Sequence, residues 1–371
     1  MGAYGKIGKK VVVSEFGETP LEALDRFLSF ETQLPPEPET LRPTDVVVVV
    51  KSAAVGWVDL LMSSGQYQHM PKPPYTPGLE SAGVVAWVGP EANHAVGDKV
   101  IVDGFLVGPR SKGAYQQYGG FASYVVAPND GVIALPSRLS FDQAASFLGN
   151  YETAYHCVIA RGQLRAGETI LIHGASGSTG LAAVHLAKML GAKVIATGRS
   201  LAKLEALKAH GVDHVVRAVD DTGAVARFRD EVKALTNGKG VDVVYDSVGG
   251  DISVESMHCA AFDARFVIVG WASTPFVAKG KGQRGAPNVN MIPTNLIMMK
   301  SLRVLGSPAV ISAHQNPQLR ATRLRDLFNW VDEGKLVPVS PEVFAFDDIK
   351  EALRAKWESR FLGGCVVHPI D

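Results

Sequence analysis

The sequence predicts an α/β protein that combines a doubly wound parallel sheet with a mostly antiparallel β domain. The parallel sheet is indicated by residues 168–203, where a short apolar strand, a glycine-rich turn, an apolar helix and a second strand follow one another. It is also indicated by the alternation of strands and helices that continues to residue 269. The β domain is indicated by short β-rich segments, joined by turn residues, in the first 130 residues.

Residues 168–203 read as one βαβ unit. Thr169–His173 is an apolar run of β type, and Ser178–Leu190 is almost wholly apolar, as in a helix that is buried against a sheet. Gly191 ends this helix, and Lys193–Thr197 is the second strand. Because crossovers of this kind are right-handed, the two strands are expected to be parallel.

The composition is typical of a two-domain protein without a strongly charged partner. The chain has 371 residues, of which 46% are hydrophobic and 20% charged, with 37 basic and 37 acidic side chains. This balance gives no support for nucleic acid or an anionic membrane as a partner. Because the sequence lacks a membrane-spanning stretch and a signal-peptide pattern, we expect a cytoplasmic protein. Cys157, Cys259 and Cys365 are isolated, which argues against a disulfide framework and a cysteine-rich zinc site.

The pattern before residue 165 predicts mainly strands. Lys10–Phe16 and Asp45–Ala53 are β-rich, and the polar, Pro-rich stretch between them is expected to form a surface loop. Trp57–Ser64 is predicted to be a helix that ends at Gly65. Further strands are predicted at Gly83–Val88, Lys99–Val102 and Phe121–Val126, and further helices at Ser140–Phe147 and Tyr151–Arg161.

The rest of the chain completes the parallel sheet and then returns to the β domain. The predicted elements are helix Leu201–His210, strand His214–Arg217, helix Val225–Thr236, strand Val241–Asp246, helix Ser253–Ala261, strand Arg265–Val269, strand Leu302–Leu305, helices Leu319–Glu333 and Asp347–Glu358, and strand Gly364–Val367. Thr274–Pro293 has no apolar period, and a loop of that length is either functional or disordered. We therefore predict one domain over 145–306 and another made of 1–144 and 307–371.

The turn of the βαβ unit resembles a dinucleotide-binding fingerprint. Ala175-Ser176-Gly177-Ser178-Thr179-Gly180 fits G-x-G-x-x-G except that the first Gly is Ala. In such a turn Gly177 lets the backbone approach a pyrophosphate, and Gly180 lets the helix pack close to the strand. The alternative is a tight turn without a ligand. The flanking strand, helix and second strand favour the nucleotide, on a Rossmann-type sheet.

The end of the second strand indicates the kind of dinucleotide. NAD-binding versions usually carry an acidic residue there, which holds the ribose 2′-hydroxyl. Here Gly198, Arg199 and Ser200 follow the strand, and Lys203 comes one helical turn later. Two cations and a hydroxyl suit a 2′-phosphate, so we predict NADPH. The alternative is a basic helix start on a solvated surface.

Several motifs together resemble the medium-chain dehydrogenase/reductase superfamily, in its zinc-free quinone and enone reductase branch. The resemblance covers nearly the whole chain. It rests on Asp59 with Gly65-Gln66-Tyr67, PGLESAGVV at 77–85, VGDKV at 96–100, GGFASYVVAP at 119–128, TAYH at 153–156, the fingerprint, and VDVVYDSVGG at 241–250. Within the branch the chain is similar to 15-oxoprostaglandin 13-reductase-like and zeta-crystallin-like proteins. The resemblance implies a GroES-like β domain beside the Rossmann domain.

The resemblance also implies that the catalytic zinc of the superfamily's alcohol dehydrogenases is missing. At the positions of their Cys, His and second Cys ligands, this chain has Gly56, Leu79 and the pair Gly149-Asn150. Glu80 is the one potential ligand in these motifs. Since zinc needs three or four N, S or O ligands, we predict no metal site.

The family pattern assigns further residues to the site. Tyr67 matches the active-site Tyr that is the proposed proton donor in enoyl-thioester reductases, although it is also explained as a loop aromatic beside four prolines. Thr153 is expected at the nicotinamide. Ser247-Val248 and Gly270-Trp271 lie at the carboxyl ends of predicted strands, where nucleotide crevices form. The family often carries Asn where this chain has Gly56, so that one polar contact is in doubt.

These features give one leading interpretation and three alternatives. The leading one is an NADPH-dependent, zinc-free reductase that delivers hydride to a small electrophile, either a quinone or the β-carbon of an α,β-unsaturated carbonyl. The alternatives are an enoyl-CoA or enoyl-acyl-carrier reductase, a non-enzymatic NADPH-binding protein of the crystallin type, and a zinc alcohol dehydrogenase. The family likeness further suggests a homodimer through the edge strand Leu302–Leu305.

Overall fold

The chain divides into two compact units, each with its own hydrophobic core. The computed structural model describes residues 5–67, 71–273 and 290–370. Within these ranges the first unit consists of 5–67, 71–148 and 338–370, and the second of 149–273 and 290–337. Two segments differ from the domains expected from sequence: 145–148 group with the first unit, and 307–337 group with the second. Within the described ranges, no helix is long and apolar enough to cross a membrane.

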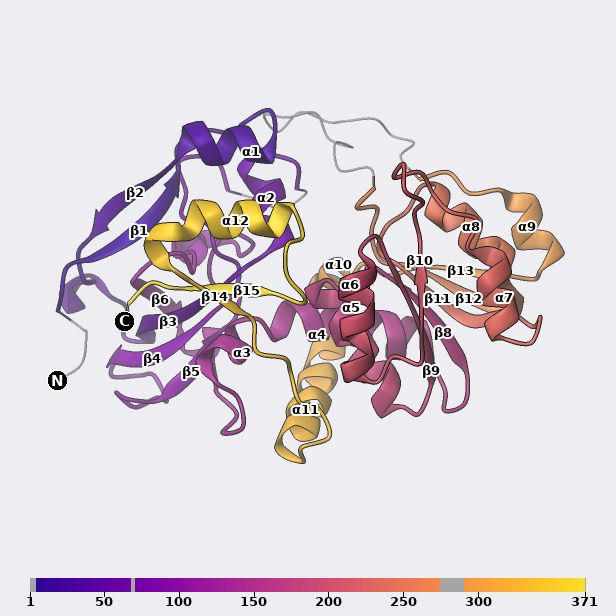
Figure 1. Cartoon of the computed structure of the whole chain (residues 1–371). Coiled ribbons are helices and arrows are strands. Elements are labelled where there is room, and N and C mark those ends of the chain that lie inside the picture. Colours follow the sequence, from indigo (N-terminus) through magenta and orange to yellow (C-terminus); the bar gives the residue numbers. More distant parts are fainter. Residues whose placement is uncertain (1–4, 68–70, 274–289, 371) are drawn as a thin grey trace. The chain divides into compact units, whose positions relative to one another are not determined.

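The second unit is built on a six-stranded parallel sheet, counted over the described residues (Figure 1). Its strand order is β10-β9-β8-β11-β12-β13, and every neighbouring pair is parallel. This is the doubly wound dinucleotide-binding order, so the predicted fold class is confirmed. The strands are β8 Thr169–His173, β9 Lys193–Gly198, β10 His214–Arg217, β11 Val241–Asp246, β12 Ala260–Ile268 and β13 Arg303–Gly306.

Helices cover both faces of this sheet because crossovers are right-handed and the chain runs outward from β8 in one direction and outward from β11 in the other. Helix α5 (Ser178–Met189) contacts β8 and β9, and α6 (Leu201–Ala206) contacts β9 and β10. After the chain returns across the sheet, α7 (Arg229–Leu235) and α8 (Asp251–Cys259) contact each other on the opposite face. The remaining helices of the unit are α4 Leu148–Tyr155 with its π-helical extension His156–Arg161, α9 Thr294–Met299, α10 Ala309–Gln315 and α11 Gln318–Asp332.

The first unit contains a mostly antiparallel sheet, as the sequence predicts. Its strands have the order β14-β15-β3-β4-β5-β7, with β6 paired to β3 and with β14 and β15 parallel. The strands are β3 Asp45–Val55, β4 Ser81–Val88, β5 Lys99–Val102, β6 Tyr124–Pro128, β7 Val132–Ala134, β14 Glu342–Ala345 and β15 Cys365–His368. Helix α12 (Ile349–Trp357) contacts this sheet and α2 (Trp57–Ser63), and both helices are visible together in Figure 1.

Some elements differ from those that the pattern predicts. The stretch expected as one loop contains β2 (Leu28–Gln33), which pairs antiparallel with β1 (Gly8–Val13) and is exposed at four of its six positions. Helix α7 begins at Arg229 instead of 225. Two short helices complete the list, α1 Pro20–Glu22 and α3 Phe141–Ala145. Most of the predicted Thr274–Pro293 loop lies outside the described residues.

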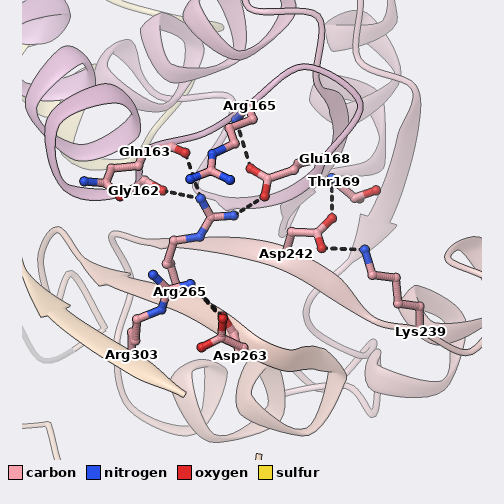
Figure 2. A network of polar contacts seen from close by, with 10 residues as sticks. All are labelled: Gly162, Gln163, Arg165, Glu168, Thr169, Lys239, Asp242, Asp263, Arg265 and Arg303. Atoms are coloured by element: carbon pink, nitrogen blue, oxygen red, sulfur yellow. Dashed lines mark hydrogen bonds and ion pairs between the residues drawn. The ribbon is translucent and has the colours of Figure 1, made fainter. Parts of the chain in front are cut away.

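A buried arginine ties the loop before β8 to β12 (Figure 2). The Arg265 side chain on β12 is 7% exposed, and its Nη1 donates to the carbonyl oxygens of Gly162 at 2.9 Å and Gln163 at 2.7 Å. Its Nη2 forms an ion pair with Glu168. A guanidinium suits this position because it presents several donors in one plane. The contact therefore sets where the chain enters β8, at the edge of the sheet opposite the glycine-rich turn.

We expect Arg265→Met to lower the free energy of unfolding of the second unit by about 3 kcal/mol, because it leaves Glu168 and two carbonyl groups without their buried partner. Arg303→Ala is the matched control. Arg303 lies on the next strand and pairs with Asp263 at 3.1 Å, but its side chain is 49% exposed, so the expected loss is below about 1 kcal/mol. Urea unfolding of both variants gives the comparison, and equal losses would contradict this account.

Candidate functional site

The second unit has a topological switch point between β8 and β11. These two strands are neighbours at the centre of the sheet, and the chain leaves them in opposite directions, toward β9 after β8 and toward β12 after β11. Ligands of doubly wound sheets bind in the crevice outside the carboxyl ends of two such strands. The glycine-rich turn leaves β8 at this edge, and the Ser247–Gly250 turn leaves β11 there.

Two glycines of the fingerprint are explained by different contacts. A Cβ on Gly180 would lie 2.2 Å from the carbonyl oxygen of Gly174, so the first turn of α5 packs directly on the preceding loop. Gly177, in contrast, has an ordinary φ of −81°. Among the described residues, the nearest atom to a Cβ on Gly177 is the Gly174 oxygen at 3.4 Å, which is a normal contact. Packing against the described residues therefore requires glycine at position 180 but not at position 177.

Helix α4 lies beside the start of α5. The Thr179 hydroxyl donates to Asn150 Oδ1 at 2.9 Å, which joins the fingerprint to α4. Thr153 lies on the same helix three residues later and is half-buried. The structure thus places Thr153 near the fingerprint through Asn150, a residue that sequence analysis considered only as a former zinc-ligand position.

The turns after β11 and β12 meet at the same edge. Ser247 Oγ donates to the carbonyl oxygen of His173 at 2.9 Å, which joins the turn after β11 to the end of β8. The backbone N–H groups of Ala272 and Ser273 donate to the carbonyl oxygens of Ser247 at 3.2 Å and Val248 at 2.9 Å. Gly270 and Trp271 lie within this paired segment, and Trp271 is 45% exposed. The predicted residues of the two turns are therefore brought together.

A buried histidine, His173, lies at the carboxyl end of β8 and links the strands and the helix that form this edge of the sheet. It was not singled out from the sequence. His173, the last residue of β8, is fully buried, with Nδ1 2.6 Å from Thr197 Oγ1 and Nε2 2.6 Å from Ser256 Oγ. Burial lowers the pKa of His173, and the nearby Asp246 opposes this effect. The imidazole thus connects β8, β9 and α8. The sequence signal that could have identified His173 is its position, as a polar residue at the end of an apolar strand and directly before the glycine-rich turn.

The basic residues after β9 lie at the same edge as the fingerprint. β8 and β9 are paired with His173 opposite Thr197, and Gly198 is the last residue of β9, so the segments after both strands leave the sheet at the same edge. Ser200 caps α6, and its Oγ accepts the backbone N–H of Lys203 at 3.4 Å. Arg199 is exposed. Partial burial lowers the pKa of Lys203, and the positive charge of Arg199 adds to this effect.

Tyr67 lies in the first unit. It follows Gly65, whose φ of +71° makes the turn after α2. Its side chain is half-buried and packs against the hydrophobic core of that unit, while residues 68–70 lie outside the described ranges. Its neighbour Gln66 has a side-chain amide that is buried without a hydrogen-bond partner in the described structure.

The former zinc positions of the first unit offer no ligand set. Gly56 begins α2, and Leu79 is 8% exposed within the apolar core. Asp59 accepts the backbone N–H groups of Gly56 at 2.9 Å and Gly78 at 3.0 Å. Burial raises the pKa of Asp59 to about 6, although these hydrogen bonds oppose the shift. Within the described residues, no group of three or more His, Cys, Asp or Glu side chains is placed to hold a metal ion.

Comparisons with known proteins agree with this architecture. A family model described as "Alcohol dehydrogenase GroES-like domain" matches residues 42–137, and one described as "Zinc-binding dehydrogenase" matches residues 178–319. The second match contains none of the zinc positions 56, 79 and 149–150.

Individual relatives match over nearly the whole chain. A "Quinone oxidoreductase-like protein 2 homolog" from Nematostella vectensis is 29% identical over 97% of this chain and 88% of its own length. The solved quinone oxidoreductase of Pseudomonas syringae pv. tomato DC3000 is 28% identical, with a TM-score of 0.75 over 98% of this chain and 100% of that one. The CurF "ER cyclopropanase" of curacin A biosynthesis is 26% identical, with a TM-score of 0.76 over 97% and 99%.

Both domain models and the full-length relatives therefore point to one group. The chain is an oxidoreductase that belongs to the medium-chain dehydrogenase/reductase superfamily, in its quinone oxidoreductase branch.

Proposed function

We propose that this protein is an NADPH-dependent, zinc-free reductase that delivers hydride to quinones or to the β-carbon of α,β-unsaturated carbonyls. The observation that carries the proposal is the switch-point edge of the second unit, where the glycine-rich turn follows β8, and Arg199 and Lys203 follow the neighbouring strand β9. Quinone oxidoreductases among the relatives support the substrate class.

The glycine-rich turn fits the pyrophosphate of a dinucleotide. Packing against the described residues gives no reason for Gly177 to lack a side chain, whereas a phosphate that approaches the backbone gives one. The 12-residue helix α5 begins directly after it, so backbone N–H groups and the positive end of the helix dipole face the same place. Gly177–Gly180 would therefore hold the pyrophosphate, and the residues proposed to contact the nicotinamide half are Thr153, Ser247, Val248, Gly270 and Trp271.

The cations after β9 fit a 2′-phosphate better than a bare ribose. Arg199 and Lys203 repel each other, and both stand at the start of α6, where positive charge opposes the helix dipole. A bound dianion would remove both unfavourable interactions. Charge-assisted hydrogen bonds from these side chains and from Ser200 would then favour NADPH over NADH.

The residues at the zinc-ligand positions of the superfamily limit the reaction that this protein can catalyse. Because Gly56 and Leu79 supply no ligand atoms, the residues do not fit a catalytic zinc. The bound dinucleotide would supply hydride, which suits a carbon that is already electron-poor. The chain's task is then to orient the acceptor and to provide a proton to the developing enolate. Tyr67 is the proposed donor.

An enoyl-CoA or enoyl-acyl-carrier reductase is the alternative activity. We also propose a homodimer through β13, which is the end strand of the sheet over the described residues. Met298 and Met299 on the preceding helix α9 are 75% and 64% exposed, which suits a protein contact.

We expect Gly177→Ala and Gly180→Ala to separate binding from folding. Gly177→Ala should weaken NADPH binding about tenfold, or ~1.4 kcal/mol, while it lowers the free energy of unfolding by less than about 1 kcal/mol. Gly180→Ala should destabilise the second unit by about 1–3 kcal/mol or more, because its Cβ meets the Gly174 oxygen. Nucleotide titration and thermal unfolding measure both quantities. If Gly177→Ala binds NADPH like the wild type, the turn is not the pyrophosphate site.

We expect NADPH to bind at least about tenfold more tightly than NADH, since each charge-assisted bond to phosphate contributes about 1.5–3 kcal/mol. Arg199→Ala combined with Lys203→Ala should remove this preference and leave NADH affinity nearly unchanged. Lys208→Ala, on the same helical segment and paired with Glu205, is the control. A double variant with the wild-type NADPH/NADH ratio would show that these cations do not read the 2′-phosphate.

The activity and the role of Tyr67 are tested together by NADPH oxidation with enones, quinones and enoyl-CoAs. We expect wild-type turnover with an enone or a quinone, and a kcat for enones that falls about 10²-fold or more in Tyr67→Phe. Quinone reduction should fall much less, because solvent protonates its oxyanions. Near-wild-type rates of Tyr67→Phe with both the enone and the quinone would show that Tyr67 only packs against the core and does not donate the proton. NADPH binding without turnover on any of these substrates would favour the crystallin-type alternative.

A further inference from the structure

We propose that Asp246 is a positioning residue, which holds the turn after β11 and the segment after β12 in the shape that receives the nicotinamide half of the dinucleotide. This inference rests on the proposed function, since it assumes that a dinucleotide lies across the switch point. Asp246 is the last residue of β11 and is fully buried. It was not among the site residues predicted from the sequence.

The carboxyl group of Asp246 organises the turn after β11. Its Oδ1 accepts the backbone N–H groups of Val248 at 3.0 Å and Gly249 at 2.9 Å. Its Oδ2 accepts the hydroxyl of Ser253 in a short hydrogen bond. One carboxylate oxygen thus binds two consecutive N–H groups of the turn, and the other binds Ser253 in the first turn of α8.

The main chain of Asp246 organises the segment after β12. Its carbonyl oxygen accepts the N–H groups of Val269 at 2.8 Å and Gly270 at 3.2 Å. The two segments then touch, because a Cβ on Gly249 would lie 3.1 Å from the Cα of Trp271. One residue therefore sets the relative position of both turns that carry the predicted nicotinamide contacts.

The order of the sheet indicates which half of the cofactor Asp246 serves. The cations that would read the 2′-phosphate follow β9, on one side of the fingerprint, and the Asp246 turns follow β11 and β12 on the other side. A dinucleotide bound across the switch point places its pyrophosphate on the fingerprint between them. The adenosine half then lies toward β9, and the nicotinamide half lies toward the Asp246 turns.

The test compares two ligands on the full-length protein, NADPH and 2′,5′-ADP, which carries only the adenosine end with its 2′-phosphate. We expect Asp246→Ala to weaken NADPH binding about tenfold or more, with the affinity for 2′,5′-ADP within about twofold of the wild type. We expect Asp246→Asn to bind NADPH within about threefold, because its Oδ1 still accepts both N–H groups and its Nδ2 can donate to Ser253.

Asp242→Ala is the matched control, since Asp242 lies on the same strand at the opposite edge. There its Oδ2 accepts the Thr169 N–H at 2.9 Å and its Oδ1 pairs with Lys239 (Figure 2). We expect it to lower the melting temperature without changing the ratio of the two affinities. A change of that ratio in Asp242→Ala, or an equal loss of both ligands in Asp246→Ala, would overturn the positioning role. So would an Asp246→Asn loss as large as that of Asp246→Ala.

A second variant keeps the inference testable if Asp246→Ala does not fold. Ser253→Ala removes one partner of the carboxyl group but keeps both main-chain contacts, and we expect it to weaken NADPH about threefold with 2′,5′-ADP unchanged. Unchanged NADPH affinity in this variant would then overturn the positioning role. Failure of the proposed function looks different, because the wild-type protein itself would bind neither NADPH nor 2′,5′-ADP.

Discussion

The close approach of helix α5 to the loop before it is the constraint on which the second unit depends. Gly180 permits this approach, since any side chain there would meet the Gly174 carbonyl oxygen. This approach directs the first N–H groups of α5 to the carboxyl ends of β8 and β11, where the chain leaves the two strands in opposite directions. Ser247 closes the same edge through the His173 carbonyl, and His173 supports it through Thr197 and Ser256. Backbone geometry, more than any one side chain, thus builds the proposed nucleotide crevice.

In the first unit, Asp59 joins the two segments that the family resemblance matches to zinc-ligand positions. Asp59 remains buried and holds the N–H groups of Gly56 and Gly78, so it fixes the two segments that carry zinc ligands in the alcohol dehydrogenases. Leu79 now contributes to the apolar core. Because Gly56 and Leu79 supply no ligand atoms, the chemistry that we propose relies on an electron-poor substrate in place of a Lewis acid.

The sequence predicted much of this architecture because the informative signals were local. The βαβ unit, the parallel sheet indicated by alternating strands and helices, and the glycine turn all follow from periodicity and turn residues. β2 was missed because just one of its six side chains is buried, so pairing with β1 and not an apolar pattern holds it in place. His173 and Asp246 were missed because their partners Thr197, Ser256 and Ser253 are distant or out of phase in the sequence, and only the fold brings them together.

The central claim is that the protein transfers hydride from NADPH to an activated carbon without a metal. The most direct measurement uses NADPH that carries deuterium at C4 of the nicotinamide, with an enone substrate and protein dialysed against a chelator. The account predicts deuterium at the β-carbon of the product, at the same rate before and after dialysis. Loss of activity on dialysis with recovery on adding Zn²⁺, or a product without deuterium from either C4 position, would contradict it.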